Sequence, residues 1–353
     1  MKIGLVGLPG SGKSSCFRML TGKREQAGGR VSDVAVVPVP DPRTARLVEI
    51  FSPPKIVHAE ITFLDLLSVR QGDSCEGEAL ELVKIAGDAD AFVLVLQCFG
   101  VMDSCGNTLD PAADLETVLL EMALTDLQTV ETRLGRLAKA TVQKKEVHQQ
   151  WEMDILQRCQ EHLSQGGAIR DLGLAEDELK YLRGFSLLTL KPWMVALNVD
   201  EDDLEGERAA GARAICAERH LPWVVLCAPL EEEIAQLPPE EQASFAADYG
   251  LQDLGRDRLI RAAYSLLRVI TFFTAGEKEV HAWTVSEGAT APDAAGRIHS
   301  DLEAGFIRAE IIPFAAMDEH CSEKLCRDHG LMRVEGRTYK MTDGDLVFIR
   351  FSR

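Results

Sequence analysis

The chain has 353 residues, of which 46% are apolar and 27% are charged, so it is long enough for two to three globular domains with their own cores. It holds no apolar run of about 18 residues, which excludes a membrane-spanning helix. The formal net charge of −18 argues against a protein that binds nucleic acid over its whole surface, because Lys and Arg side chains drive that binding.

The cysteines and the first residues indicate the compartment. Nine cysteines are scattered without a Cys-x-x-Cys pair, and the chain enters a predicted strand directly, which leaves no room for a signal peptide. We therefore expect a cytoplasmic protein with reduced thiols. A monomer is slightly favoured, although no motif defines the oligomeric state.

The strongest motif is the turn Gly-Leu-Pro-Gly-Ser-Gly-Lys-Ser at residues 7–14. It lies between an apolar run at 2–6, which predicts a buried strand, and residues 15–20, which have helical spacing. Backbone N–H groups of such a turn wrap a polyphosphate, and the helix N-terminus favours negative charge. The sequence therefore predicts a nucleoside triphosphate site with these binding residues: Gly7, Pro9, Gly10, Ser11, Gly12, Lys13, Ser14 and Ser15.

Two side chains of this turn have predicted chemical roles. Lys13 is expected to bind the β- and γ-phosphates, and the Ser14 hydroxyl to bind Mg²⁺. Residues 22–33, which follow, are polar and rich in glycine, and Ser32 is their only hydroxyl candidate where P-loop switches carry a threonine. Residues 34–43 then predict an edge strand punctuated by prolines and a helix that begins at Asp41.

A β-rich run at 59–64 ends in Asp65, the position of a Mg²⁺-orienting carboxylate in such enzymes. We expect Lys13 and Asp65 to be catalytic and Ser14 and Asp65 to bind the metal; the alternative is an Asp65 that caps a turn. Ser68 stands where switch NTPases have the Gly of Asp-x-x-Gly, and the apolar Val69 stands where they keep a water-orienting Gln. These changes predict slow hydrolysis.

The middle of the chain combines another strand with long helices. Residues 90–97 form an apolar run typical of a parallel sheet, and Phe99 follows at the end where ligands collect, although ordinary packing also explains it. Apolar residues at helical spacing over 115–137 and 147–163 predict two amphipathic helices. They indicate an antiparallel arm or, alternatively, helices packed flat on the nucleotide domain.

A strand at 190–197 leads into Asn198-Val199-Asp200-Glu201, at the position of the base-reading motif. The guanine-specific form is Asn-Lys-x-Asp, and here Val199 replaces the Lys and Glu201 the Asp, which favours adenine over guanine. A strand-end turn is the alternative. Residues 224–229 predict a further strand and exit loop, in which Cys227 and Ala228 would line the base pocket.

In the C-terminal residues 274–353 the sequence predicts strands at 279–285, 306–313 and 345–351 around one helix, capped by Thr290 and ending near Gly305. An irregular part and a segment at 332–341 with a turn at 335–337 precede the last strand, and the whole predicts a small α+β, ubiquitin-like domain. With these pieces placed, the chain resembles the YchF branch of the Obg-related translation-factor NTPases over nearly its whole length. The matching segments are residues 7–14, 38–43, 198–201, 272–276, 283–285, 288–292 and 305–310.

This resemblance implies an α/β architecture with three parts. They are a Ras-like P-loop NTPase domain at 1–114 and 190–270, a helical coiled-coil insertion at 115–189, and a C-terminal α+β TGS (β-grasp) domain at 274–353. It also implies ATP in preference to GTP, with Phe99 near the adenine, and association with a ribosome or RNA. The resulting hypothesis is a slow ATPase; a non-enzymatic nucleotide-gated binding module and an Obg-type GTPase are the alternatives.

Overall fold

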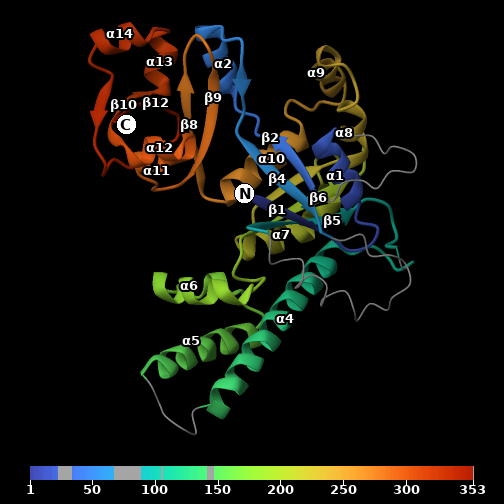
Figure 1. Cartoon of the computed structure of the whole chain (residues 1–353). Helices are drawn as coiled ribbons and strands as arrows, with labels where there is room; N and C mark the ends of the chain where they lie inside the picture. Colours follow the sequence, from blue (N-terminus) through green and yellow to red (C-terminus); the bar gives the residue numbers. More distant parts are fainter. Residues whose placement is uncertain (23–33, 67–88, 105, 141–146, 353) are drawn as a thin grey trace. The chain divides into compact units, whose positions relative to one another are not determined.

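The computed structural model describes residues 1–22, 34–66, 89–104, 106–140 and 147–352 (Figure 1). The chain forms two compact units: unit 1 comprises Met1–Ala35 and Thr62–Leu259, and unit 2 comprises Val36–Ile61 and Ile260–Arg353. The three-domain boundaries expected from the sequence remain predictions. No helix in the described ranges is long and apolar enough to cross a membrane.

Unit 1 is built on a parallel sheet, as the apolar strand runs predicted. Its strands are β1 (Lys2–Val6), β4 (Glu60–Asp65), β5 (Ala91–Cys98), β6 (Trp193–Val199) and β7 (Trp223–Leu226), and β2 (Val34–Pro38) forms the edge of the order β2-β4-β1-β5-β6-β7. Every residue of β5 and β6 is buried, as expected for central strands covered on both faces. The predicted α/β class is confirmed.

Parallel pairing brings the carboxyl ends of these strands to one edge of the sheet. The glycine turn follows β1, Asp65 ends β4, Phe99 follows β5, and Asn198 lies at the end of β6. Ligands of open α/β sheets bind at this edge. The helices that belong with this sheet are α1 (Lys13–Thr21), α7 (Ala210–Glu218), α8 (Ala228–Ile234), α9 (Pro239–Asp248) and α10 (Gly255–Leu266).

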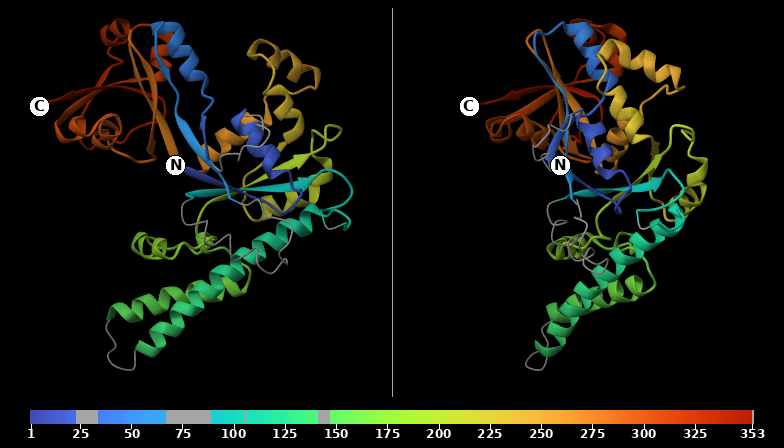
Figure 2. Two further views of the ribbon diagram at one scale, coloured as in Figure 1. Left: turned by 45° about the vertical axis from the view of Figure 1, so that its right-hand side comes forward. Right: turned by 90° about the vertical axis from the view of Figure 1, so that its right-hand side faces the viewer.

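Two long helices of unit 1, α4 (Pro111–Ala140) and α5 (Val147–Ser164), lie side by side (Figure 2). The first part of α4 packs Leu115, Val118 and Met122 into the core of the sheet, and α4 then forms a separate apolar cluster with α5 through residues such as Val130 and Ile155. The first part of α4 thus packs on the sheet, and its later part packs on α5 instead, so the helix pair extends from the sheet rather than lying flat on it. Short helices η2 (Ile169–Asp171), α6 (Glu176–Leu182) and η3 (Arg183–Phe185) adjoin this second cluster.

Unit 2 has a mixed six-stranded sheet in the order β11-β10-β12-β8-β9-β3. Its strands are β3 (Ile56–Val57), β8 (Val269–Ala275), β9 (Val280–Ser286), β10 (Phe306–Pro313), β11 (Arg333–Glu335) and β12 (Asp345–Phe351), and its helices are α2 (Pro42–Phe51), α11 (Ala291–Ile298), α12 (Ser300–Ala304), α13 (Phe314–His320) and α14 (Glu323–Asp328).

Three sequence predictions for unit 2 need correction. The single helix expected from Thr290 to Gly305 is two helices, because His299 is extended at φ −164° between α11 and α12. The segment expected at 332–341 around a turn contains one short strand, β11, and the part expected to be irregular contains α13 and α14. The predicted cap is confirmed: the Thr290 N–H and hydroxyl both donate to Asp293, each at 2.7 Å.

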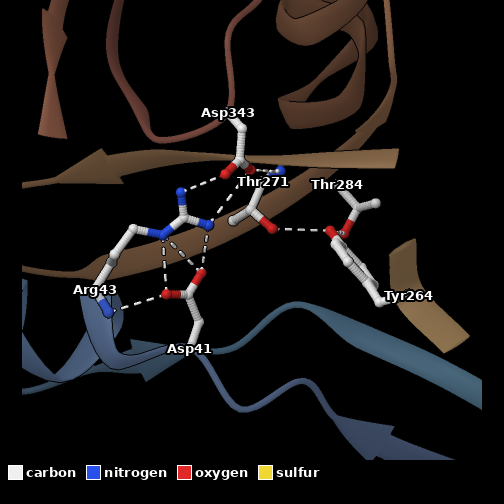
Figure 3. Close-up of polar contacts among 6 residues, drawn as sticks. All are labelled: Asp41, Arg43, Tyr264, Thr271, Thr284 and Asp343. Atoms are coloured by element: carbon white, nitrogen blue, oxygen red, sulfur yellow. Dashed lines mark hydrogen bonds and ion pairs between the residues drawn. The ribbon is translucent and has the colours of Figure 1, made fainter. Parts of the chain in front are cut away.

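The proline-punctuated segment around Asp41 belongs to unit 2 (Figure 3). Asp41 caps α2, as predicted, by accepting from the Arg43 backbone N–H at 2.9 Å. The Arg43 guanidinium donates to both Asp41 and Asp343, with Nη1 2.6 Å from the latter, and Asp343 also accepts the Thr271 N–H at 2.9 Å. This network fastens α2 to the C-terminal sheet, and the hydroxyl of Tyr264 extends it through Thr271 and Thr284.

Candidate functional site

The glycine turn of unit 1 has the conformation that phosphate binding requires. Gly10 and Gly12 both have φ +83°, a left-handed conformation open to glycine, and Gly12 is the N-cap of α1. A Cβ on Gly12 would overlap the Nδ2 of Asn198, so no other residue fits there. The N–H groups of the first turn of α1 have no acceptor within the helix and are available to an anion.

The members of the turn differ in exposure. Pro9, Gly10 and Ser14 are exposed, Gly7, Gly12 and Ser15 are half-buried, and Ser11 and Lys13 are buried. The hydroxyl of Ser11 is buried without a hydrogen-bond partner among the described residues. Ser15 accepts a hydrogen bond from Arg18 at 3.0 Å and is therefore engaged within α1. An orphaned hydroxyl, free helix N–H groups and an obligatory glycine together fit a polyphosphate.

Lys13 and Asp65 are brought together as the sequence predicted for a common site. The Lys13 ammonium donates to the Asp65 carboxylate from the adjacent strand, and the two form an ion pair in which the Lys13 side chain is 8% exposed. The ammonium has three donors, so a triphosphate at the turn would compete with Asp65 for Lys13. The Asp65 carboxylate and the exposed Ser14 hydroxyl are both oxygen ligands of the kind Mg²⁺ takes.

Asn198 connects two loops of the site. It is 1% exposed; its Nδ2 donates to the Ser11 carbonyl at 3.0 Å, and its Oδ1 accepts the Ala228 N–H at 3.0 Å. The sequence predicted that Asn198 lies at the nucleotide base, whereas its two hydrogen bonds hold the phosphate turn against the loop that follows β7. This bridging role is a finding of the structure.

The other residues expected at the nucleotide base differ in burial and position. Val199 is buried among the core residues of unit 1, while Glu201 is exposed. The Phe99 ring lies 3.6 Å from where a Cβ of Gly12 would be, which puts it beside the phosphate turn. Cys227 and Ala228 are buried directly after β7.

Two functional contacts were missed in the sequence. Gln97 donates to the Phe99 carbonyl at 3.2 Å and so holds the loop after β5. Glu231, in a Glu-Glu-Glu run that reads as solvent-exposed, is buried and accepts the Arg256 N–H at 2.6 Å. Burial is the main cause that raises the pKa of Glu231 to about 7, against the lowering effect of its backbone hydrogen bonds. Sequence periodicity gives no signal for either contact.

Several predicted switch positions lie outside the described residues. They are Ser32, Ser68 and Val69. Within the described ranges, no group of three or more His, Cys, Asp and Glu is arranged to hold a metal. A Mg²⁺ site built on a nucleotide takes few protein ligands, because phosphate oxygens and water supply the rest.

Comparison with known proteins agrees with this geometry. The family model YchF-GTPase_C, described as "Protein of unknown function (DUF933)", matches residues 269–352. The "Ribosome-binding ATPase YchF" of Haemophilus ducreyi is 39% identical over 361 residues, which cover 99% of this chain and 99% of that protein. The protein of the same name from Bacillus subtilis is 36% identical over 366 residues, which cover 99% of this chain and 98% of that protein. The solved structure of the Schizosaccharomyces pombe YchF GTPase superposes with a TM-score of 0.89 at 26% identity, over 99% of this chain and 97% of that one.

Proposed function

Because the chain belongs to the YchF family, we propose that it binds ATP with Mg²⁺ and hydrolyses ATP slowly to ADP and phosphate. It would act in the cytoplasm as a nucleotide-dependent factor associated with the ribosome or with RNA, the association that its bacterial relatives carry in their names. The observation that supports this most is the convergence of the glycine turn, Lys13 and Asp65 at one edge of the sheet.

Each residue of this convergence has a proposed task. The turn and the first N–H groups of α1 bind the phosphates, and the Lys13 ammonium neutralises charge that develops on the β- and γ-oxygens. Ser14 and Asp65 would hold the Mg²⁺, which supplies further neutralisation of the phosphate oxygens when bound. Catalysis is then mainly positioning and charge stabilisation. The predicted absence of a water-orienting Gln limits the rate.

The nucleotide base is the second part of the proposal. Glu201 is exposed at the end of β6 and the Phe99 ring lies beside the turn, an arrangement that favours stacking of an adenine over the paired hydrogen bonds that guanine demands. The solved relative is titled a GTPase, so GTP is the competing nucleotide. Competition of ATP and GTP for a fluorescent ATP analogue decides between them. Clear GTP preference would contradict the assignment of Glu201.

We further propose that the parts of the chain have the names the family implies. The α4–α5 pair would be the coiled-coil insertion at 115–189, and residues 274–353 the TGS domain. Deletion of the paired ends of α4 and α5, with a short Gly-Ser linker in their place, should weaken ribosome co-sedimentation and leave ATP affinity unchanged. Unchanged co-sedimentation would remove the proposed role of the helix pair.

Hydrolysis itself is tested by phosphate release from ATP with Mg²⁺ present. The Lys13→Ala variant should reduce the rate to background, whereas Arg183→Gln, an exposed change away from the site, should not. Equal signal in the parent and in Lys13→Ala would mean that the observed phosphate does not come from this site. The remaining role would then be that of a nucleotide-gated binding module.

A further inference from the structure

A second cavity of unit 1 lies apart from the phosphate turn. It has a volume of about 290 Å³ and opens between α4, the end of α5, η2 and the end of α7. Leu119 and Met122 of α4 form an apolar wall, and Arg170, Arg219, His162 and His220 place cationic or hydrogen-bonding groups around it. This size lies at the lower end of the range for small-molecule sites.

Arg170 is the unusual member of this cavity. Its side chain is only 22% exposed, yet the carboxylate nearest to it among the described residues, Asp171, lies 3.9 Å away and is itself exposed. Its other contact, Nη1 to the Lys191 carbonyl, is 3.4 Å long. Arg18 of the same unit, at similar exposure, has a carboxylate at 2.7 Å. Burial without a close counter-ion lowers the pKa of Arg170.

The cavity also contains hydrogen-bonding groups that the protein leaves incompletely used. The Nε2 of His162 is buried without a partner in the described part of the chain. Arg219 reaches the Gly166 carbonyl with one nitrogen at 3.3 Å, which leaves its other donors available. A half-buried cation with only long contacts and a buried ring nitrogen without a partner in the described part of the chain cost free energy that a ligand can offset.

The backbone that carries Arg170 is held rigidly. Asp126 of α4 accepts three hydrogen bonds, from the Leu188 N–H at 2.8 Å, the Thr189 N–H at 2.7 Å and the Thr189 hydroxyl at 2.6 Å. Thr189 in turn accepts the Arg170 N–H at its carbonyl, at 3.2 Å. The guanidinium therefore starts from a fixed backbone, which lowers the entropy cost of binding.

We propose that this cavity binds a small organic anion, with its carboxylate or phosphate on the Arg170 guanidinium and its apolar part against Leu119 and Met122. Arg170 offers the planar pair of donors that both oxyanions match. Asp171 and Glu218 at the cavity add negative charge, which selects for a ligand with one or two charges over a polyanion such as RNA. The site is independent of the proposed ATP chemistry.

The test uses phenyl phosphate, which combines an oxyanion with an apolar ring. Titration calorimetry is done in the parent and in Lys13→Ala, and binding that is equal in the two is assigned to the cavity rather than to the phosphate turn. One phenyl phosphate should bind per chain, at least tenfold more tightly than inorganic phosphate, because the ring covers the apolar wall. Benzoate in a parallel titration distinguishes a carboxylate site from a phosphate site.

The Arg170→Gln variant should weaken phenyl phosphate binding at least tenfold, while the exposed control Arg183→Gln leaves it unchanged. Should Arg170→Gln fail to fold, judged by circular dichroism, Leu119→Trp provides the decision, because it fills the cavity and keeps every charge. Absence of binding, or equal binding to a folded Arg170→Gln or Leu119→Trp variant, would overturn the proposal.

Discussion

Replacement of Asn198 by Ala tests whether this side chain holds the phosphate turn. The change leaves the Ser11 carbonyl without its donor and the Ala228 N–H without its acceptor, both inside unit 1. An unsatisfied buried group costs about 1–3 kcal/mol, so we expect the free energy of unfolding to fall by about 2–4 kcal/mol. Because the turn also loses its tether, ATP affinity should fall at least tenfold.

The assay is urea denaturation without nucleotide, followed by tryptophan fluorescence. Trp193 opens the strand that carries Asn198 and is 3% exposed, so its emission reports loss of this part of unit 1. Nucleotide affinity is measured separately with a fluorescent ATP analogue. Glu205→Gln, an exposed change seven residues further on, is the matched control and should alter stability by less than about 0.5 kcal/mol.

A second variant separates the two contacts. Asn198→Asp keeps an acceptor for the Ala228 N–H but loses the donor to the Ser11 carbonyl. If the tether to the turn controls nucleotide binding, Asp and Ala at this position should weaken ATP to a similar degree. Parent-like stability and affinity in Asn198→Ala would refute the bridging role.

Three further predictions concern other parts of the fold. Gly12→Ala should abolish ATP binding in fluorescence titrations, because its Cβ meets Asn198 and φ +83° disfavours alanine; ordinary affinity would contradict the geometry of the turn. Burial raises the pKa of Glu231 to about 7 in the folded state, from an ordinary value of 4.5. The folded state therefore holds this proton more tightly, and the free energy of unfolding should fall by on the order of 3 kcal/mol as pH rises between these two values. Glu231→Gln should flatten this pH dependence in urea titrations at several pH values. Arg43→Ala should lower the stability of unit 2 by about 1–3 kcal/mol in thermal melts, more than Arg46→Ala, whose side chain is 40% exposed; equal losses would argue against the network of Figure 3.

Local patterns in the sequence predicted the elements that are set by local physics. A strand, a glycine turn and a helix start define the phosphate turn, and Asp41 before Pro42 defines a helix cap. Residues 115–137 and 147–163 have helical spacing that predicted α4 and α5 within a few residues. The resemblance to YchF is likewise confirmed by the relatives.

Contacts between residues far apart in the sequence could not be predicted from local patterns. Strand β3 has two residues and pairs with β9, where Ile56 meets Val280, and nothing in a two-residue run predicts such a partner. For the same reason the sequence did not assign α2 to unit 2. The motif at 198–201 shows a different limit of sequence reasoning. Its position predicted correctly that Asn198 and Val199 lie at a strand end, but it did not predict that the Val199 side chain is buried in the core. A strand end has two faces, and which one is buried depends on the neighbouring strands.

The Lys13–Asp65 ion pair joins two parts of unit 1 between which the chain passes through unit 2. The chain leaves unit 1 after Ala35, contributes α2 and β3 to unit 2, and returns at Thr62, three residues before Asp65. Val36–Ile61, which lies between the two partners of the ion pair in the sequence, is thus part of the other unit, where Arg43 and its carboxylates hold it. A triphosphate that takes Lys13 from Asp65 changes the interactions at the return point of this segment. If nucleotide binding changes the stability of that segment, linkage requires that a change which stabilises the segment shifts nucleotide affinity by the same factor.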